Sequence, residues 1–178
     1  SNYAEAKEII RLLKDFFETR MANETIGIIT FNSNQRDLIE ELLDEECRSD
    51  NSFAVKLQEE LIRKRNGEDI GLFVKNIENV QGDERDVIIF SIGYAKDDRG
   101  RLVTQFGWLS QKGGENRLNV AITRAKREIH IVTSFEPSEL QVEQSKNNGP
   151  KYLKKYLEYC FAVSNKDKAS AQQILHSF

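Results

Sequence analysis

The chain has 178 residues, with 26 Lys or Arg against 29 Asp or Glu and a net charge of −3. Its 39% of hydrophobic residues, ten Phe and only two Pro exclude a disordered or collagen-like chain. The charge balance excludes a global positive field that would draw the chain to nucleic acid, so any site for a polyanion must be local.

Cysteine and histidine are scarce. Cys47, Cys160, His130 and His176 are too few for a disulfide framework or a four-ligand zinc site, so we expect reduced cysteines and no metal site. No apolar run approaches the ~20 residues that span a bilayer, and the N-terminal residues lack a signal-peptide pattern. We therefore expect a cytoplasmic protein that does not contact a membrane.

The first third of the chain predicts helices around one strand. Residues 5–19 carry apolar residues at helical spacing. Residues 25–31 are a β-branched run typical of a strand, and Asn32 can cap the helix that follows. Another helix is expected near residues 53–63.

The remainder predicts a parallel sheet. Apolar runs at residues 70–74, 87–92 and 129–133 lack the alternation of half-exposed strands, so they suit strands buried on both faces. A helix is expected at residues 115–126, and helices between strands imply parallel pairing with right-handed crossovers. Residues 94–114 look like a long surface loop.

The sequence lacks a recognisable self-sufficient active site. It contains no Gly-x-x-x-x-Gly-Lys-Ser/Thr loop, so it cannot by itself hold a nucleotide's phosphates in that manner. It also lacks a plausible nucleophilic triad. We therefore do not expect the chain alone to be a complete enzyme.

The segment GGENRLNVAITRAK is the strongest local signal. On the predicted helix, Arg117 and Arg124 are seven residues apart and would share one face, with the small Ala121 between them. Two guanidinium groups in a row can bind phosphate. Spacing alone leaves open that they pair with carboxylates such as Glu115 and Glu128.

Residues 117–125, RLNVAITRA, resemble motif VI of the superfamily 1 helicases, in their C-terminal RecA-like domain. The resemblance implies that Arg124 is an arginine finger that reaches the γ-phosphate held by a first lobe. It also implies a nucleotide contact for Arg117 and a nucleic-acid contact for Asn119. A planar cation there would stabilise the charge that spreads over the phosphate oxygens during transfer.

The segment QGDERD followed by VIIFS resembles motif V of the same family. The resemblance implies that Gly82 and Glu84 lie near the nucleotide, and that Gln81 and Asn76 contact nucleic acid. The family usually has Thr-Val-Asp where this chain has Asn-Ile-Glu from Asn76 onward. Without the resemblance, the segment would be interpreted as a charged, solvated turn between strands.

The segment GIITFNSNQR is similar to motif IV. The similarity implies that Gln35 and Arg36 approach the nucleotide phosphates and that Asn32 contacts nucleic acid. The family commonly has Thr-Pro-Tyr where this chain has Thr-Phe-Asn. Taken alone, Arg36 could instead pair with Glu40 one helical turn later.

The three motifs occur in the family's order, so the resemblance implies a C-terminal RecA-like helicase lobe over residues 1–134. Its fold would be an α/β parallel sheet flanked by helices, of the P-loop NTPase type but without the P-loop, with a helical extension over residues 135–178. The lobe would belong to an ATP-dependent helicase or translocase acting on single-stranded DNA or RNA.

The same resemblance implies a partner, because the N-terminal RecA-like lobe of the same polypeptide would hold most of the ATP and Mg²⁺. We expect the isolated chain to be monomeric and inactive. We also expect Arg36, Arg117 and Arg124 to cluster at one edge of the sheet, with the acidic residues 40–46 facing away. The alternative is a non-catalytic RecA-like docking module.

Overall fold

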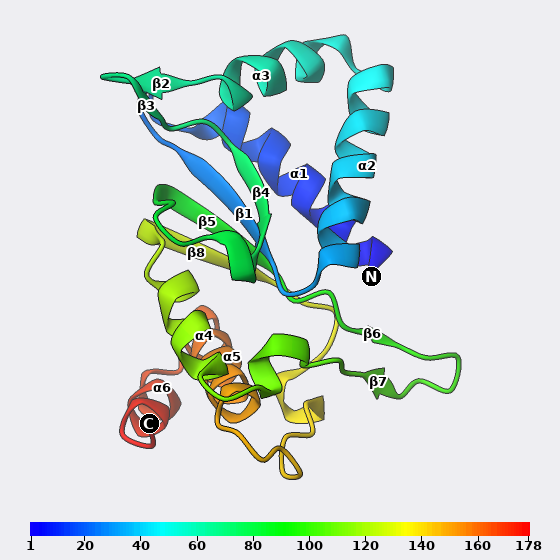
Figure 1. The fold of residues 1–178 in the computed structure, drawn as a ribbon, viewed down its shortest axis with the longest axis vertical. Helices are drawn as coiled ribbons and strands as arrows, with labels where there is room; N and C mark the ends of the chain where they lie inside the picture. The colour runs from blue at the N-terminus through cyan, green and yellow to red at the C-terminus, as the bar shows by residue number, and fades with distance from the viewer. The chain divides into compact units, whose positions relative to one another are not determined.

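The computed structural model describes all residues, 1–178, and divides them into two compact units (Figure 1). The first unit comprises Ser1–Gly93 and Ala121–Thr133, and the second comprises Tyr94–Val120 and Ser134–Phe178. Residues 94–120, which we expected within the lobe, therefore group with the C-terminal residues. The division into a lobe over residues 1–134 and a helical extension over residues 135–178 stays a prediction.

Four parallel strands form the sheet of the first unit, in the order β4-β1-β5-β8. The strands are β1 (Ile26–Thr30), β4 (Phe73–Asn76), β5 (Arg85–Ser91) and β8 (Ala125–Val132). Thr30 lies beside Asn76 and Ser91 at the carboxyl end of the sheet, and Arg85 lies beside Ala125 at the amino end. The predicted parallel sheet is confirmed.

Burial explains which residues form the central strands. Ile28 and Ile29 of β1 and Phe90 of β5 are fully buried, as expected for strands covered on both faces. The outer strand β8 is mostly half-exposed or exposed and begins at Ala125, four residues before its apolar run. Pairing with β5, rather than apolar content, therefore determines where β8 starts.

Three helices pack on one face of this sheet: α1 (Tyr3–Thr19), α2 (Ser33–Ser49) and α3 (Asn51–Leu61) (Figure 1). The apolar stripes of these helices meet alternate strand residues in a single core. That core includes Ile9, Leu13, Ile39, Leu42, Phe53, Leu57, Ile26, Ile28, Val87 and Ile89. The amphipathic spacing seen in the sequence thus corresponds to a real buried face.

Each of the three helices has a side-chain N-cap. Asn2, Asn32 and Asp50 each accept the backbone N–H three residues on, at donor-to-acceptor distances of 3.2, 2.8 and 3.0 Å. Such caps satisfy donors that the first helical turn leaves unpaired. After α3, the strands β2 (Lys64–Arg65) and β3 (Glu68–Asp69) form a two-residue hairpin on Asn66 and Gly67, both with positive φ.

The second unit holds most of the irregular structure. Its elements are β6 (Ala95–Lys96), β7 (Leu102–Val103), the 3₁₀ helices η2 (Gly107–Ser110) and η3 (Pro137–Glu139), α5 (Gly149–Ser164) and α6 (Lys168–Leu175). Residues 94–114 are therefore a short hairpin and a 3₁₀ turn instead of a plain loop. No helix of the chain has both the length and the apolar character to cross a membrane.

The helix predicted at residues 115–126 is wrong at its end. Helix α4 (Gly114–Ile122) stops before Thr123, and the backbone N–H of Arg124 donates to Ala121 in a turn. The Arg124 carbonyl then accepts the backbone N–H of Arg85, a strand-type bond that the helix would have prevented. Arg117 and Arg124 thus do not share a helix face, and Ala121 is fully buried.

Buried polar side chains join α1, α2 and β5 at the carboxyl end of the sheet. The Gln35 amide, fully buried, donates to the Asn2 carbonyl and to Ser91 Oγ, both at 3.0 Å. Glu5 Oε2 accepts from Ser91 Oγ at 3.0 Å and from the Gly93 N–H at 2.8 Å. The beginnings of two helices are thereby fixed to the end of a strand.

We predict that Gln35→Ala lowers the free energy of unfolding by about 2–4 kcal/mol, because it removes the buried hydrogen bonds that the Gln35 amide makes to the backbone of Asn2 and to Ser91 Oγ. Urea unfolding of this chain measures the change. Asn34→Ala, at the exposed neighbouring position, is the matched control and should change it by less than about 0.5 kcal/mol. Equal losses in the two variants would contradict the prediction.

Candidate functional site

The motif V and motif VI segments meet at the amino end of the sheet. The Arg85 N–H donates to the Arg124 carbonyl at 3.1 Å, so the residues preceding β5 and β8 lie side by side. Glu84 Oε1 lies 3.9 Å from Arg124 Nη1, and Glu84 Oε2 lies 3.8 Å from Lys126 Nζ. The structure thus brings together Glu84 of motif V and Arg124 of motif VI.

The exposure of this pair differs between its members. The Glu84 side chain is 50% exposed, whereas that of Arg124 is 17% exposed. Arg124 Nη2 also lies 3.2 Å from Thr123 Oγ1. A half-exposed carboxylate at 3.9 Å holds a guanidinium weakly, since water screens the interaction. The Glu84 contact by itself therefore contributes little to holding Arg124.

The turn that leads to Glu84 depends on Gly82. Its φ is +88°, a conformation that side chains with a Cβ rarely adopt, although no atom lies close enough to obstruct a Cβ. The Asp83 N–H donates to the Val80 carbonyl at 3.2 Å, and Lys75 pairs with Asp83 at 2.7 Å. The turn leaves Gln81 exposed to solvent. Gly82 therefore has a conformational role whether or not a nucleotide approaches it.

The motif IV residues lie at the other end of the sheet. Asn32 Oδ1 caps α2, and the buried Gln35 amide is occupied by the bonds described above. Arg36 contacts Asp37 Oδ1 through Nε at 2.9 Å and Nη2 at 2.5 Å. The carboxylate of Asp37, with a smaller contribution from Glu40, raises the pKa of Arg36. The expected partner Glu40 is thus secondary to the adjacent Asp37.

The Asn76 side chain bonds the backbone of its own segment. It is 7% exposed, and its Oδ1 accepts the Glu78 N–H at 3.4 Å at the start of the 3₁₀ helix η1 (Ile77–Asn79). Arg117 and Asn119, by contrast, are exposed on the part of α4 that belongs to the second unit. The predicted nucleic-acid contacts therefore differ in accessibility, with Asn119 and Gln81 open and Asn76 mostly covered.

The expected clustering of arginines is not found within the first unit. Arg36 follows the carboxyl end of β1, whereas Arg124 precedes the amino end of β8, and the strands are parallel. The two guanidinium groups therefore start from opposite ends of the sheet. The acidic residues of α2 are partly neutralised, since Glu46 forms an ion pair with Lys14.

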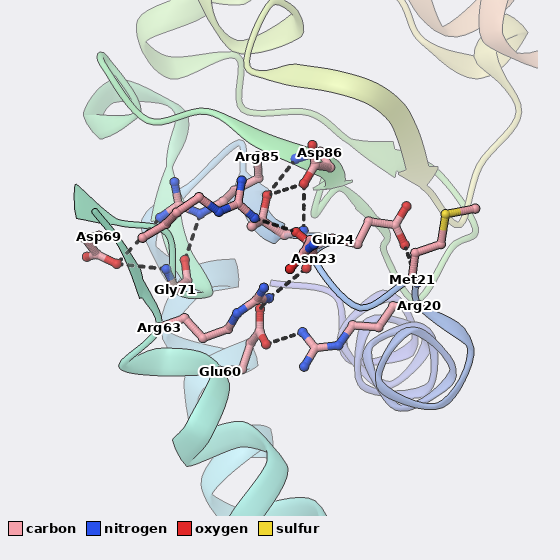
Figure 2. Close-up of polar contacts among 12 residues, drawn as sticks. Arg20, Met21, Asn23, Glu24, Glu60, Arg63, Asp69, Gly71, Arg85 and Asp86 are labelled. Atoms are coloured by element: carbon pink, nitrogen blue, oxygen red, sulfur yellow. Dashed lines mark hydrogen bonds and ion pairs between the residues drawn. The ribbon is translucent and has the colours of Figure 1, made fainter. Parts of the chain in front are cut away.

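Sequence reasoning missed two residues beside this pair. Arg85 is buried, and Asp86 accepts bonds from the N–H and the hydroxyl of Thr25, both at 2.8 Å (Figure 2). Burial favours a higher pKa for Asp86, but the two Thr25 bonds outweigh it and the pKa is lowered. In the sequence, Arg85 and Asp86 directly precede the apolar run of residues 87–92. Charged residues next to a buried strand need polar partners, so this position could have indicated their buried contacts.

The chain has no group of three or more His, Cys, Asp or Glu side chains arranged to hold a metal ion. The candidate site offers cations and amides, which suit a phosphate or a nucleic-acid backbone.

The parallel sheet flanked by helices and the motif segments at its ends define a C-terminal RecA-like lobe of the superfamily 1 helicase type. Residues 1–136 match the model of a protein family described as "AAA domain". The chain belongs to this family.

Two curated relatives of this chain are named as ATP-dependent helicases. An uncharacterized ATP-dependent helicase of Mycoplasma pneumoniae is 43% identical over 92% of this chain, and one of Mycoplasma genitalium is 44% identical over 92%. The chain spans 14% of the length of each relative. A solved C-terminal domain of a possible DNA helicase from Lactobacillus is 17% identical, covers 81% of this chain and 76% of its own, and has a TM-score of 0.42.

We predict that Thr25→Val raises the pKa of Asp86 toward its ordinary value near 3.9, because the variant loses the hydroxyl bond to the ionised carboxylate. The lowered pKa stabilises the fold above about pH 4, and this contribution is lost as the pH falls through the folded-state pKa. The variant should therefore lose stability at pH 6 and show a flatter dependence between pH 2 and pH 4.

An NMR titration of Asp86 and urea unfolding at pH 3 and pH 6 measure these effects. Thr104→Val, at a half-buried position of the second unit, is the matched control. An Asp86 pKa that is the same in both variants would show that Thr25 does not set it.

Proposed function

We propose that the chain is the second motor lobe of an ATP-dependent superfamily 1 DNA or RNA helicase or translocase. The observation that carries the proposal is the contact of Glu84 with Arg124, which joins the motif V and motif VI segments at one end of the sheet. The names of the Mycoplasma relatives, both ATP-dependent helicases, support the same class of activity.

Arg124 is the proposed arginine finger. Its guanidinium is planar, always charged and able to donate two parallel bonds to a phosphate. Its carboxylate contact with Glu84 is long at 3.9 Å and half-exposed, so a γ-phosphate can take the place of that carboxylate. During phosphoryl transfer, negative charge spreads over the equatorial oxygens, where a cation of this kind stabilises the transition state.

Arg36 is the second proposed phosphate ligand, and it acts from the other end of the sheet. It must first release Asp37, which it now contacts. The buried Gln35 assists by fixing the start of α2, so its contribution to the nucleotide site is to hold the Arg36 backbone. Gly82, Glu84 and the exposed Arg117 complete the proposed nucleotide contacts.

Single-stranded DNA or RNA is the proposed substrate of the intact protein. The exposed amides of Gln81 and Asn119 would bond its sugars, phosphates or bases, and Asn32 and Asn76 would contribute from the ends of β1 and β4. Amides are neutral, so such contacts add little to the salt dependence of binding compared with arginines.

The N-terminal RecA-like lobe is the proposed partner. This chain has neither a P-loop nor a metal cluster, so the P-loop lysine, the Mg²⁺ ligands and most of the ATP pocket would belong to that lobe. Phosphate binding by Arg124 would favour closure of the two lobes, and loss of the γ-phosphate would favour opening.

The isolated chain is predicted not to hydrolyse ATP, because it lacks the groups that hold the β- and γ-phosphates. A phosphate-release assay with ATP, Mg²⁺ and single-stranded nucleic acid tests this. Turnover that depends on Mg²⁺ and disappears in Arg124→Ala would contradict it.

In the full-length protein, Arg124→Ala is predicted to lower kcat by about 10³-fold while nucleotide Kd changes by no more than about threefold, because the arginine acts mainly in the transition state. Single-strand-stimulated ATPase kinetics and nucleotide titration measure the two quantities. Arg48→Ala, on the exposed last turn of α2, is the matched control. Equal losses in kcat and affinity would mean that Arg124 only anchors phosphate.

A further inference from the structure

Arg85 is a buried cation directly beside Glu84 and the proposed arginine finger, Arg124. The residue is 5% exposed and lies at the first position of β5 (Figure 2). Its guanidinium donates from Nε to the Gly71 carbonyl and from Nη1 to the Glu84 carbonyl, both at 2.8 Å. The motifs assign no role to this residue, so its burial needs another explanation.

The peptide group between Glu84 and Arg85 is held at both of its polar atoms. Its carbonyl oxygen accepts the bond from Arg85 Nη1, and its N–H donates to the Arg124 carbonyl at 3.1 Å. A peptide plane fixed on both sides cannot rotate without breaking a buried bond. The position of the Glu84 side chain and the path of the backbone at Arg124 therefore depend on the same group.

The guanidinium is in turn held by the segment after the β2–β3 hairpin. Gly71 has no room for a Cβ, which would collide with the carbonyls at the end of α3, so its own carbonyl stays directed at Arg85. Asp69 Oδ1 accepts the Gly71 N–H at 2.8 Å and lies 3.9 Å from Arg85 Nη2. The Phe73 ring lies 5.1 Å from the guanidinium carbon, close enough for a cation–π contact.

A buried acid keeps that segment in place. Glu60 is fully buried and pairs with Arg20 and with Arg63, the latter at 2.8 Å (Figure 2). The Glu60 carbonyl accepts the Leu72 N–H at 3.1 Å, which fixes the residue after Gly71. The chain of contacts thus runs from the end of α3 through Gly71 to Arg85.

We propose that Arg85 is a positioning residue that holds Glu84 and Arg124 in the geometry that phosphoryl transfer requires. This inference rests on the proposed function of Arg124. Arg85 does not touch the nucleotide; it acts through the Glu84–Arg85 peptide and its bond to the Arg124 carbonyl. Lysine cannot replace it, because an ammonium group lacks the planar fork that reaches two carbonyls at once.

Stability alone is a poor reason for a cation at this place. Burial lowers the pKa of Arg85 from its ordinary value, and the carboxylate of Asp69 only partly opposes that shift. Replacing buried ionic groups by apolar ones of similar size is often neutral or stabilising. The bonds to two carbonyls give Arg85 a geometric role that an apolar side chain of its length would lack.

The test uses the full-length protein and four variants: Arg85→Met, Arg85→Lys, Arg124→Ala and the double variant Arg85→Met/Arg124→Ala. We expect Arg85→Met and Arg85→Lys to lower kcat by about tenfold or more with nucleotide Kd within about twofold. The double variant should be no slower than Arg124→Ala, because Arg85 acts through Arg124. Arg65→Ala is the matched control, since Arg65 bonds the nearby Asn23 carbonyl but neither Glu84 nor Arg124.

A second readout does not depend on turnover. Amide hydrogen exchange at residue 85 reports the bond to the Arg124 carbonyl, and it should be about tenfold faster in Arg85→Met than in the parent or in Arg65→Ala. Unchanged exchange together with unchanged kcat would overturn the inference. A double variant that loses the product of the two single effects would also overturn it, because the residues would then act independently.

The outcomes separate this inference from the proposed function. If Arg124→Ala leaves turnover intact, the proposed function fails, and the exchange rate at residue 85 still decides whether Arg85 holds the segment. If Arg85→Met does not fold, Arg85→Lys decides, since it keeps the positive charge but not the planar fork that reaches the Gly71 and Glu84 carbonyls. A normal kcat and an unchanged exchange rate at residue 85 in that variant would overturn the inference.

Discussion

The bond from the Arg85 N–H to the Arg124 carbonyl is the contact on which the candidate site depends. It begins the parallel pairing of β5 with β8, and that pairing ends α4 at Ile122 instead of allowing the helix to continue. Without it, Arg124 would extend a helix and Glu84 would lie on an isolated turn. The two motif residues meet because a strand, and not a helix, follows the Thr-Arg step.

Buried polar side chains stabilise both ends of the sheet. At the carboxyl end, the amide of Gln35, the hydroxyl of Ser91 and the buried carboxyl group of Glu5 join two helices to the end of β5 by hydrogen bonds. At the amino end, the buried Glu60 and Arg85 are held by opposite charges and by backbone carbonyls. Removing a partner from a buried ionisable group costs more than removing one from a neutral group, so both networks specify their geometry strictly.

The sequence predicted the fold better than the site. Apolar periodicity located α1, α2 and the central strands, because burial of a stripe or of a continuous run decides those elements. It failed at residues 123–126, where the helical spacing of the motif continues although tertiary pairing imposes a strand. It could not reveal that Gln35 and Asn76 turn their amides toward local backbone, or that Arg36 and Arg124 start from opposite ends. These facts depend on strand order and register, which no local pattern encodes.

The net charge of −3 becomes compatible with an anion site once ion pairs are considered locally. Glu46 and Asp50 share Lys14, and Glu60 is shared by two arginines, so three acidic side chains face three cations away from the candidate site. At the amino end, Glu84 faces both Arg124 and Lys126, which leaves more positive than negative charge among these three side chains. A carboxylate shared between two cations holds each of them only partly. An entering phosphate, with more than one negative charge, can therefore compete for Arg124 although the chain as a whole is acidic.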